Sequence, residues 1–121
     1  MKITELRIGN LVSVANVISP VLSVHEANVV SLGKGLLENY DISEVLPISL
    51  TPEILIKAGF KTQDMADMGS YIYLIVNHPY LYLSFNDASI WIGEHNTKVT
   101  TLHQLQNLYF ALTGEDLTIN L

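Results

Sequence analysis

The alternation of apolar with aromatic or polar residues between Tyr71 and Ile92 constrains the fold more than any other feature of the sequence. Side chains of a β-strand point alternately to the two faces of a sheet, so a period of two predicts half-buried strands. Turn-forming residues, Asn-His-Pro and Asn-Asp-Ala, interrupt the pattern twice. We therefore predict a three-stranded antiparallel meander with strands at Tyr71–Val76, Leu81–Phe85 and Ile90–Ile92.

The register of this meander follows from the faces that it would produce. With loops of four residues, Val76 lies opposite Leu81 and Phe85 lies opposite Ile90, and residues directly opposite share a face. One face is then aliphatic apart from one phenylalanine: Ile72, Leu74, Val76, Leu81, Leu83, Phe85, Ile90 and Ile92. The other face carries Tyr71, Tyr73, Ile75, Tyr82, Ser84 and Trp91. A slip of one residue would mix the two sets, so this register is favoured.

The C-terminal segment predicts an amphipathic helix over residues 102–113. Thr101 and Gln104 have the spacing of a capping box, and Gly114 supplies the stop. Apolar residues recur at helical spacing at Leu105, Leu108, Tyr109 and Leu112. We expect this stripe to pack on the aliphatic face of the meander, the usual layering of an α+β domain.

The N-terminal half predicts a small β-barrel-like sheet, because Val-, Ile- and Leu-rich runs are separated by Gly or Asn every eight to ten residues. Its expected strands are 6–12, 17–24, 28–32 and 36–42, with a tight reversal at Gly33–Gly35. Pro20 implies an edge strand or a bulge in the second of these strands.

Two short helical segments and one loop are expected between the sheets. Residues 41–45 predict a single turn. Thr51, Pro52 and Glu53 predict the start of a two-turn helix, because they suit the cap, the first helical position and the helix dipole. Gly59 ends this helix, and residues 63–70 are expected to form a loose loop.

Length and composition predict one domain over 1–121, with a β-rich half (1–50) and an α-β-β-β-α half (51–121). The chain has twelve acidic and six basic residues, and the basic ones are scattered singly, so nucleic acid is not an expected partner. The longest apolar run is far too short to cross a membrane, and the N-terminus lacks a signal-peptide pattern. A cytoplasmic protein is the expectation.

No catalytic, cofactor or metal site is predicted. The four histidines, His25, His78, His95 and His103, have no pair with the spacing of a local metal site. The chain has no cysteine and no Gly-x-Ser-x-Gly elbow, and Gly33–Gly35 lacks the spacing of a phosphate loop. The paired acids Glu115 with Asp116 and Asp64 with Asp67 lie in turn-like, exposed segments. We therefore do not expect an enzyme.

The feature that points to a function is the set of aromatic residues on one meander face: Tyr71, Tyr73, Tyr82 and Trp91. Tyrosine and tryptophan are enriched at protein interfaces, which makes this face a candidate interaction surface. Hydrophobic residues make up 49% of the chain and charged residues 15%, and this apolar balance favours a surface that a partner or second subunit covers. The alternative is that the aromatic side packs against the N-terminal sheet of the same chain.

Three segments resemble an uncharacterised family of small proteins from Bacteroides-type bacteria that are often encoded in prophages and mobile elements. These segments are Leu6–Val12 (LRIGNLV), Pro47–Glu53 (PISLTPE) and His103–Glu115 (HQLQNLYFALTGE). The resemblance implies a phage-related setting and a non-enzymatic role. It carries no catalytic residues, because the family has no established activity.

The leading hypothesis is therefore a phage-related accessory protein that binds a protein partner or a second copy of itself. An alternative is an acidic regulator that engages a nucleic-acid-binding protein through Glu38, Asp41 and Glu44. A hydrolase of unknown type, with a pocket lined by His78, Asp87 or His95, is the third hypothesis.

Overall fold

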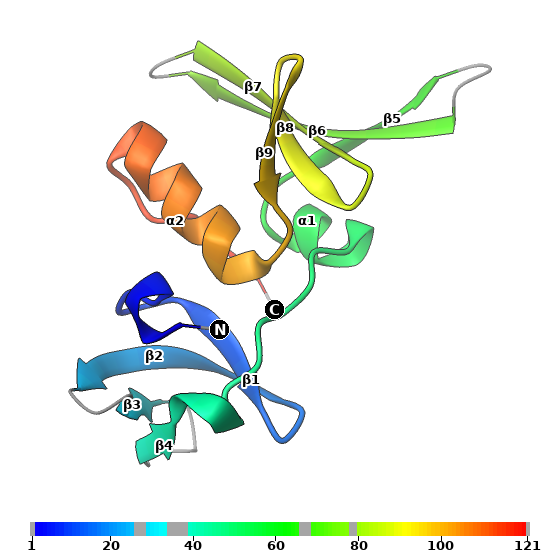
Figure 1. The fold of residues 1–121 in the computed structure, drawn as a ribbon. Coiled ribbons are helices and arrows are strands. Elements are labelled where there is room, and N and C mark those ends of the chain that lie inside the picture. The colour runs from blue at the N-terminus through cyan, green and yellow to red at the C-terminus, as the bar shows by residue number, and fades with distance from the viewer. Residues whose placement is uncertain (1, 26–28, 34–38, 66–68, 78–79, 121) are drawn as a thin grey trace. The chain divides into compact units, whose positions relative to one another are not determined.

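The computed structural model describes residues 2–25, 29–33, 39–65, 69–77 and 80–120. It confirms an α+β protein with two antiparallel sheets and a C-terminal helix, α2 (Leu102–Thr113) (Figure 1). The chain divides into two compact units, each described below by itself. Unit 1 comprises Met1–Ser49 and Thr101–Asn107, and unit 2 comprises Leu50–Thr100 and Leu108–Leu121. The single domain expected over residues 1–121 stays a prediction.

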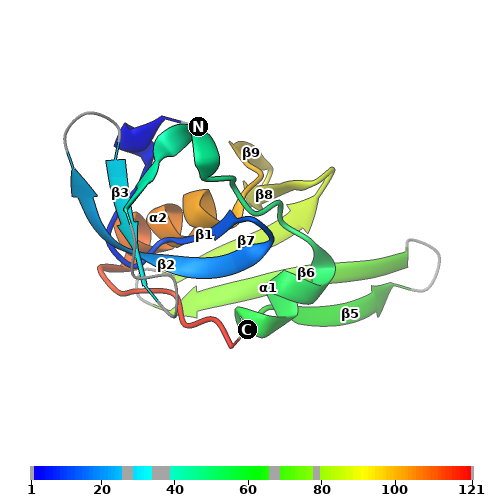
Figure 2. The ribbon, with the colours of Figure 1, turned by 90° about the horizontal axis from the view of Figure 1, so that it is seen from below.

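Unit 1 is built on a curled sheet of four antiparallel strands in the order β1-β2-β3-β4. Its elements are η1 (Ile3–Glu5), β1 (Leu11–Val14), β2 (Val17–His25), β3 (Val29–Leu32), β4 (Asn39–Asp41) and η2 (Ile42–Glu44). Figure 2 shows the bend of β2 along its length. The inner face of the sheet buries a cluster of aliphatic side chains: Leu6, Val12, Val14, Val21, Val30, Leu32 and Val45.

The strand predicted from Leu6 is wrong in its first half, because β1 begins only at Leu11. The backbone reverses before it: Arg7 N donates to Asn10 Oδ1 at 2.7 Å, and Asn10 N donates to Arg7 O at 3.0 Å. Gly9 lies in the left-handed region (φ +93°), which other residues rarely adopt. Local side-chain bonding of Asn10 therefore prevailed over the β-propensity of its neighbours.

Of the two alternatives predicted for the strand that contains Pro20, an edge position or a bulge, the structure shows a bulge in β2. The pairing of β2 with β3 shifts register between Val21 and Ser23, while Pro20 itself lies opposite Leu11 of β1. Pro20 pairs only with β1, because the pairing of β2 with β3 begins at Val21 opposite Leu32, so its missing N–H removes no bond between β2 and β3. The single turn predicted at 41–45 is also confirmed, as η2 capped by Asp41. The reversal predicted at Gly33–Gly35 and the first residues of the strand predicted at 36–42 lie outside the described residues.

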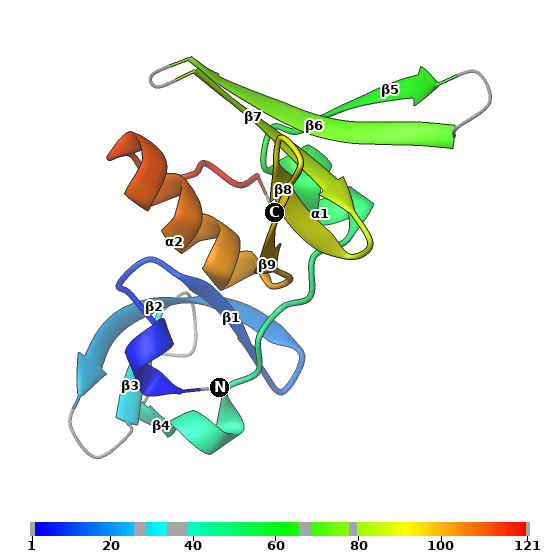
Figure 3. The same ribbon diagram turned by 45° about the horizontal axis from the view of Figure 1, so that its top comes forward.

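Unit 2 is built on a five-stranded antiparallel sheet in the order β5-β6-β7-β8-β9 (Figure 3). Its strands are β5 (Lys61–Met65), β6 (Gly69–Asn77), β7 (Tyr80–Asn86), β8 (Ser89–Ile92) and β9 (His95–Val99). The predicted short helix is present as α1 (Pro52–Lys57), with Thr51 Oγ1 accepting from Ile54 N at 3.3 Å. Gly59, at φ +96°, follows the end of this helix.

The predicted register of the meander is confirmed. Val76 lies opposite Leu81, and Phe85 lies opposite Ile90. The strands extend one pair further than predicted at each turn: Asn77 also pairs with Tyr80, and Asn86 also pairs with Ser89. The second pair leaves a loop of two residues. Asp87 and Ala88 of that loop both have positive φ, as the tight turns favoured in hairpins require.

The sheet has two strands more than predicted, and both are edge strands. The loose loop expected at 63–70 is wrong at both of its ends, because residues 63–65 belong to β5 and residues 69–70 to β6. β9 follows a turn at Gly93–Glu94. Neither carries an apolar alternation, since Lys61, Thr62 and Gln63 are all exposed and β9 is largely polar. Edge strands tolerate such residues because only one side is paired, so the pattern that revealed the interior strands is absent.

The C-terminal helix is confirmed at its predicted bounds, but its burial is uneven. Leu102, His103 and Leu105 are buried, while Leu108, Tyr109 and Leu112 are half-buried. One half of the predicted capping box is present, because Thr101 N donates to Gln104 Oε1 at 3.3 Å. The docking of this helix on the aliphatic face of the meander stays a prediction, since α2 contributes residues to both units.

Candidate functional site

The aromatic face, defined as Tyr71, Tyr73, Tyr82 and Trp91, lies on three neighbouring strands of unit 2. Tyr71 and Tyr73 belong to β6, Tyr82 to β7 and Trp91 to β8. The paired residues Tyr73, Ser84 and Trp91 lie in a row across these strands, so they share one side of the sheet, as predicted. All four aromatic side chains are half-buried. The alternative in which this side packs against the N-terminal sheet stays a prediction.

Three of the rings form a compact cluster, which we call the tyrosine cluster: Tyr71, Tyr73 and Tyr82. Their centroids are 5.6–5.9 Å apart, and their planes differ by 8–23°. Three nearly equal separations describe a triangle, because the outer rings of a column would be twice as far apart. The cluster therefore presents a broad aromatic surface.

The register shows how far two of these side chains lean. Tyr82 lies opposite Ile75. Ile75 is four residues from Tyr71 on β6, so the backbones of Tyr71 and Tyr82 are offset along the strands by roughly 13 Å. The two ring centroids are nevertheless 5.9 Å apart. Tyr71 and Tyr82 therefore converge over Tyr73 between them. Offset aromatic contacts of this kind stabilise by about 0.5–1.5 kcal/mol beyond the burial of their area.

The side chain of Trp91 is held separately, at the turn between β7 and β8. Its indole Nε1–H donates to the carbonyl of Asn86 at 3.0 Å, which satisfies the one polar atom of the ring. Ser84, between Tyr73 and Trp91 in the row, is only 6% exposed. The face thus combines a tyrosine cluster at one end with an anchored indole at the other.

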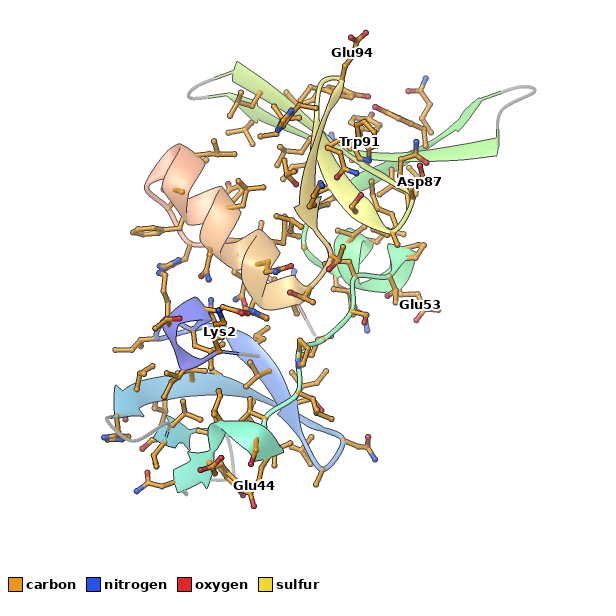
Figure 4. The ribbon with its side chains drawn as sticks, in the orientation of Figure 1. Lys2, Glu44, Glu53, Asp87, Trp91 and Glu94 are labelled. Carbon is orange, nitrogen blue, oxygen red and sulfur yellow. The ribbon has the colours of Figure 1, made fainter. Side chains whose placement is uncertain are left out.

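Charged residues surround this face unevenly. Lys61 lies opposite Tyr73 on the edge strand β5. Asp87 precedes β8 and Glu94 follows it, both are exposed, and Figure 4 shows Trp91 between them. Lys98 is exposed on β9, where the register shifts between the pairs of Ile90 and Trp91. The indole end of the face therefore has a carboxylate at each end of its strand.

A second cluster, in unit 1, involves residues whose role was not predicted: Arg7, Asn10, Gln106 and Asn107. We call it the polar network. Asn107 Oδ1 accepts from Asn10 Nδ2 at 2.8 Å and from Arg7 Nη1 at 3.2 Å, and Asn107 Nδ2 donates to Glu5 O at 2.9 Å. Asn10 is only 2% exposed. Its amide group is therefore satisfied by protein atoms, as a buried polar group requires.

Gln106 extends this network to the edge of the four-stranded sheet. Its Oε1 accepts from Leu11 N at 2.8 Å, and its Nε2 donates to Gly9 O at 3.2 Å. The side chain thereby pairs with backbone at the start of β1, much as another strand would. Two of the segments on which the family resemblance rests, 6–12 and 103–115, thus meet through their polar residues. Helical periodicity places Gln106 and Asn107 off the apolar stripe of α2 and gives no sign of these bonds.

His103 is buried beside this network. It is 1% exposed, its Nε2 lies 3.4 Å from Glu5 Oε2, and its Nδ1 lies 3.3 Å from Thr101 Oγ1. These partners fit the neutral tautomer with the proton on Nε2. Burial lowers the pKa of His103 below its ordinary value of 6.5, and the Glu5 carboxylate offsets only part of that effect. The pKa of Glu5 is also lowered: burial opposes this, but the Lys2 amide and His103 outweigh it.

We expect the stability of the protein to fall as pH drops below 6.5. A histidine whose pKa is lower in the folded state binds its proton more readily when unfolded, so its contribution is present above pH 6.5 and is lost as pH falls through the folded-state pKa. One proton gives a slope of at most ~1.4 kcal/mol per pH unit. Urea unfolding of the wild type and of His103→Gln between pH 5 and 7.5 measures the difference. Equal slopes in the two proteins would contradict it.

The other histidines and acids singled out by sequence are dispersed. His25 Nε2 lies 2.8 Å from both Ser23 Oγ and Ser31 Oγ on exposed parts of β2 and β3, and Ser31 also contacts Asn39. His95 is exposed at the start of β9, and His78 lies outside the described residues. Within the described part of the chain, no three His, Asp or Glu side chains gather closely enough to hold a metal ion.

The acidic residues of the second hypothesis are also only partly described. Asp41 caps η2 by accepting from Ser43 N at 2.9 Å, and this hydrogen bond lowers the pKa of Asp41. Glu44 is exposed on η2, whereas Glu38 lies outside the described residues. The structure therefore gives Asp41 a local structural role.

A cavity of about 380 Å³ lies in unit 2, and its lining includes no residue of the aromatic face. The end of α1, Leu74 of β6, Tyr109 of α2 and the C-terminal tail line it. Asn120 N donates to Lys57 O at 3.0 Å, which holds the tail against α1. The lining includes one basic residue, Lys57, and two acidic residues, Glu115 and Asp116, among apolar and polar residues.

No family model, curated protein or solved structure matches this chain. Among the described residues, none of the helices has the length and apolar character needed to cross a bilayer.

Proposed function

We propose that this protein is a non-enzymatic interaction protein that binds another protein molecule, either a different chain or a second copy of itself, through the aromatic face. The observation that carries the proposal is the tyrosine cluster, whose three neighbouring rings are only half-buried and lie on the same side of the sheet as Trp91. Tyrosine and tryptophan dominate binding energy at interfaces because they bring large, rigid contact area at low entropic cost. We place the protein in the cytoplasm, and we expect its partner to be a protein rather than nucleic acid.

The resemblance of residues 6–12, 47–53 and 103–115 supports a further part of the proposal, namely that the protein acts in a prophage or mobile-element setting. An accessory protein in such a setting acts by contact with phage or host proteins. A lysate of a Bacteroides-type bacterium is therefore the appropriate source in which to search for a partner.

The experiment compares the wild type with a face variant, Tyr71→Thr/Tyr82→Thr, which removes two rings and keeps residues suited to strands. Light scattering at high concentration measures self-association, and affinity capture from lysate measures partner binding. A control variant, Val17→Thr/Leu22→Thr, removes two exposed apolar side chains from β2 in unit 1. Thermal unfolding verifies that both variants are folded.

We expect the face variant to lose at least tenfold in affinity or self-association, and the control variant to retain the wild-type value. A monomer with no captured partner would refute the proposal. So would a partner bound equally well by the face variant.

A further inference from the structure

Unit 2 carries most of the negative charge of the protein. It contains seven of the twelve acidic residues and three of the six basic ones. Two of the acidic residues, Asp87 and Glu94, lie in the turns at the two ends of β8, the strand that carries Trp91. Exposed acidic residues raise the local concentration of cationic partners and speed their association.

The anchored indole itself favours a cation. The face of an aromatic ring attracts ammonium and guanidinium groups, and tryptophan does so more strongly than tyrosine or phenylalanine. The bond from Trp91 Nε1 to Asn86 O fixes one edge of the ring at the turn that contains Asp87. A cationic group over this indole would therefore have a carboxylate close by.

The basic residues of the sheet, Lys61 and Lys98, oppose the binding of a cation at Trp91 only in part. Lys61 lies on β5, three strand spacings or about 14 Å from β8, which exceeds the Debye length of ~8 Å at physiological salt. Lys98 is nearer, on β9. Its backbone N–H donates to Asn96 Oδ1 at 2.8 Å, and Asn96 lies opposite Trp91. Its charge should weaken the binding of a cation, which makes Lys98 a useful test position.

We propose that the partner of the aromatic face presents a basic segment, and that an arginine or lysine side chain of this segment lies over Trp91 between Asp87 and Glu94. The tyrosine cluster then contacts the apolar residues of the same partner. This inference rests on the proposed function and adds the chemistry of the partner. A nucleic acid would carry the opposite charge and would be repelled by the same two carboxylates.

The test uses a capped synthetic heptapeptide with three arginines separated by glycines, and a counterpart in which glutamate replaces each arginine. Trp91 is the only tryptophan of the chain, so its fluorescence reports binding at the proposed site directly. Titrations at low and at physiological salt measure Kd and its ionic-strength dependence. We expect the arginine peptide to change Trp91 fluorescence, with weaker binding at higher salt, and the glutamate peptide to have no effect.

Two charge variants with equal net charge separate a local site from general attraction. Asp87→Asn/Glu94→Gln removes the proposed pair, and asparagine tolerates the left-handed backbone at position 87 (φ 51°). Glu44→Gln/Glu115→Gln removes two exposed charges elsewhere. We expect the first variant to weaken peptide binding about fivefold to tenfold and the second by less than twofold.

Trp91→Leu and Lys98→Gln complete the series, with binding followed by anisotropy of a labelled peptide. We expect Trp91→Leu to weaken binding about fivefold and Lys98→Gln to strengthen it about twofold. Equal binding of the arginine and glutamate peptides, or equal losses in the two charge variants, would overturn the inference. Capture that depends on Tyr71 and Tyr82 but not on Asp87 and Glu94 would leave the proposed function standing and refute only the basic partner.

Discussion

Replacement of Asn107 by alanine should lower the free energy of unfolding by about 3 kcal/mol, a large share of the stability of a small protein. Asn107 bonds to Glu5 O, to the Asn10 amide and to the Arg7 guanidinium at once. Alanine removes these three hydrogen bonds and leaves the buried Asn10 amide without its acceptor. An unsatisfied buried donor loses its full hydration energy, which exceeds the net value of the bond.

Urea unfolding followed by circular dichroism measures this loss. Gln63→Ala is the matched control, because it deletes an amide from an exposed side chain on the edge strand β5. We expect it to change stability by less than ~0.5 kcal/mol. Asn107→Asp should fall between the two, since it keeps the acceptor for Asn10 and loses the donor to Glu5 O. A loss below ~1 kcal/mol in Asn107→Ala would mean that water replaces the network.

Replacement of Leu105 by alanine should be similarly destabilising, by about 2–5 kcal/mol, because its side chain is fully buried. The substitution removes the free energy that these methyl groups gain when folding transfers them out of water. It also leaves a cavity that the surrounding atoms close only in part. Leu112→Ala makes the same chemical change seven residues later in α2, where the side chain is half-buried. Both changes alter helix propensity equally, so the difference between them isolates burial.

We expect Leu112→Ala to destabilise by no more than half as much as Leu105→Ala in the same unfolding experiment. Equal losses would show that the apolar stripe of α2 is buried along its whole length, as the sequence predicts. The gradient in the structure instead concentrates burial at Leu102, His103 and Leu105.

The sequence predicted the interior of the five-stranded sheet well. The pairs Val76 with Leu81 and Phe85 with Ile90 were predictable because a strand has a period of two and only one register separates aliphatic from aromatic side chains. The bounds of α2 were predictable for a similar reason, since caps and a stop glycine border its helical period. The residues of the aromatic face followed directly from the register.

The polar edge strands and the turn at residues 7–10 could not be predicted from periodicity. β5 and β9 acquire their strand conformation by pairing with β6 and β8, and their own residues carry no alternation. The turn at residues 7–10 depends on Asn10, whose side chain bonds to Arg7 N locally and to Asn107 across 97 residues of sequence. Long-range bonds of this kind leave no period in the sequence.

By itself, then, the sequence determined which residues share a face of the meander, where the helices begin and end, and that Tyr71, Tyr73, Tyr82 and Trp91 lie on one side. These follow from local periodicity and backbone geometry. Only the tertiary structure decided that three of the rings converge into a cluster, that Trp91 is anchored between two acidic turns, and that Asn107 connects α2 to the N-terminal turn. Side-chain direction and long-range hydrogen bonds depend on what surrounds each residue in space, and only the folded chain specifies those surroundings.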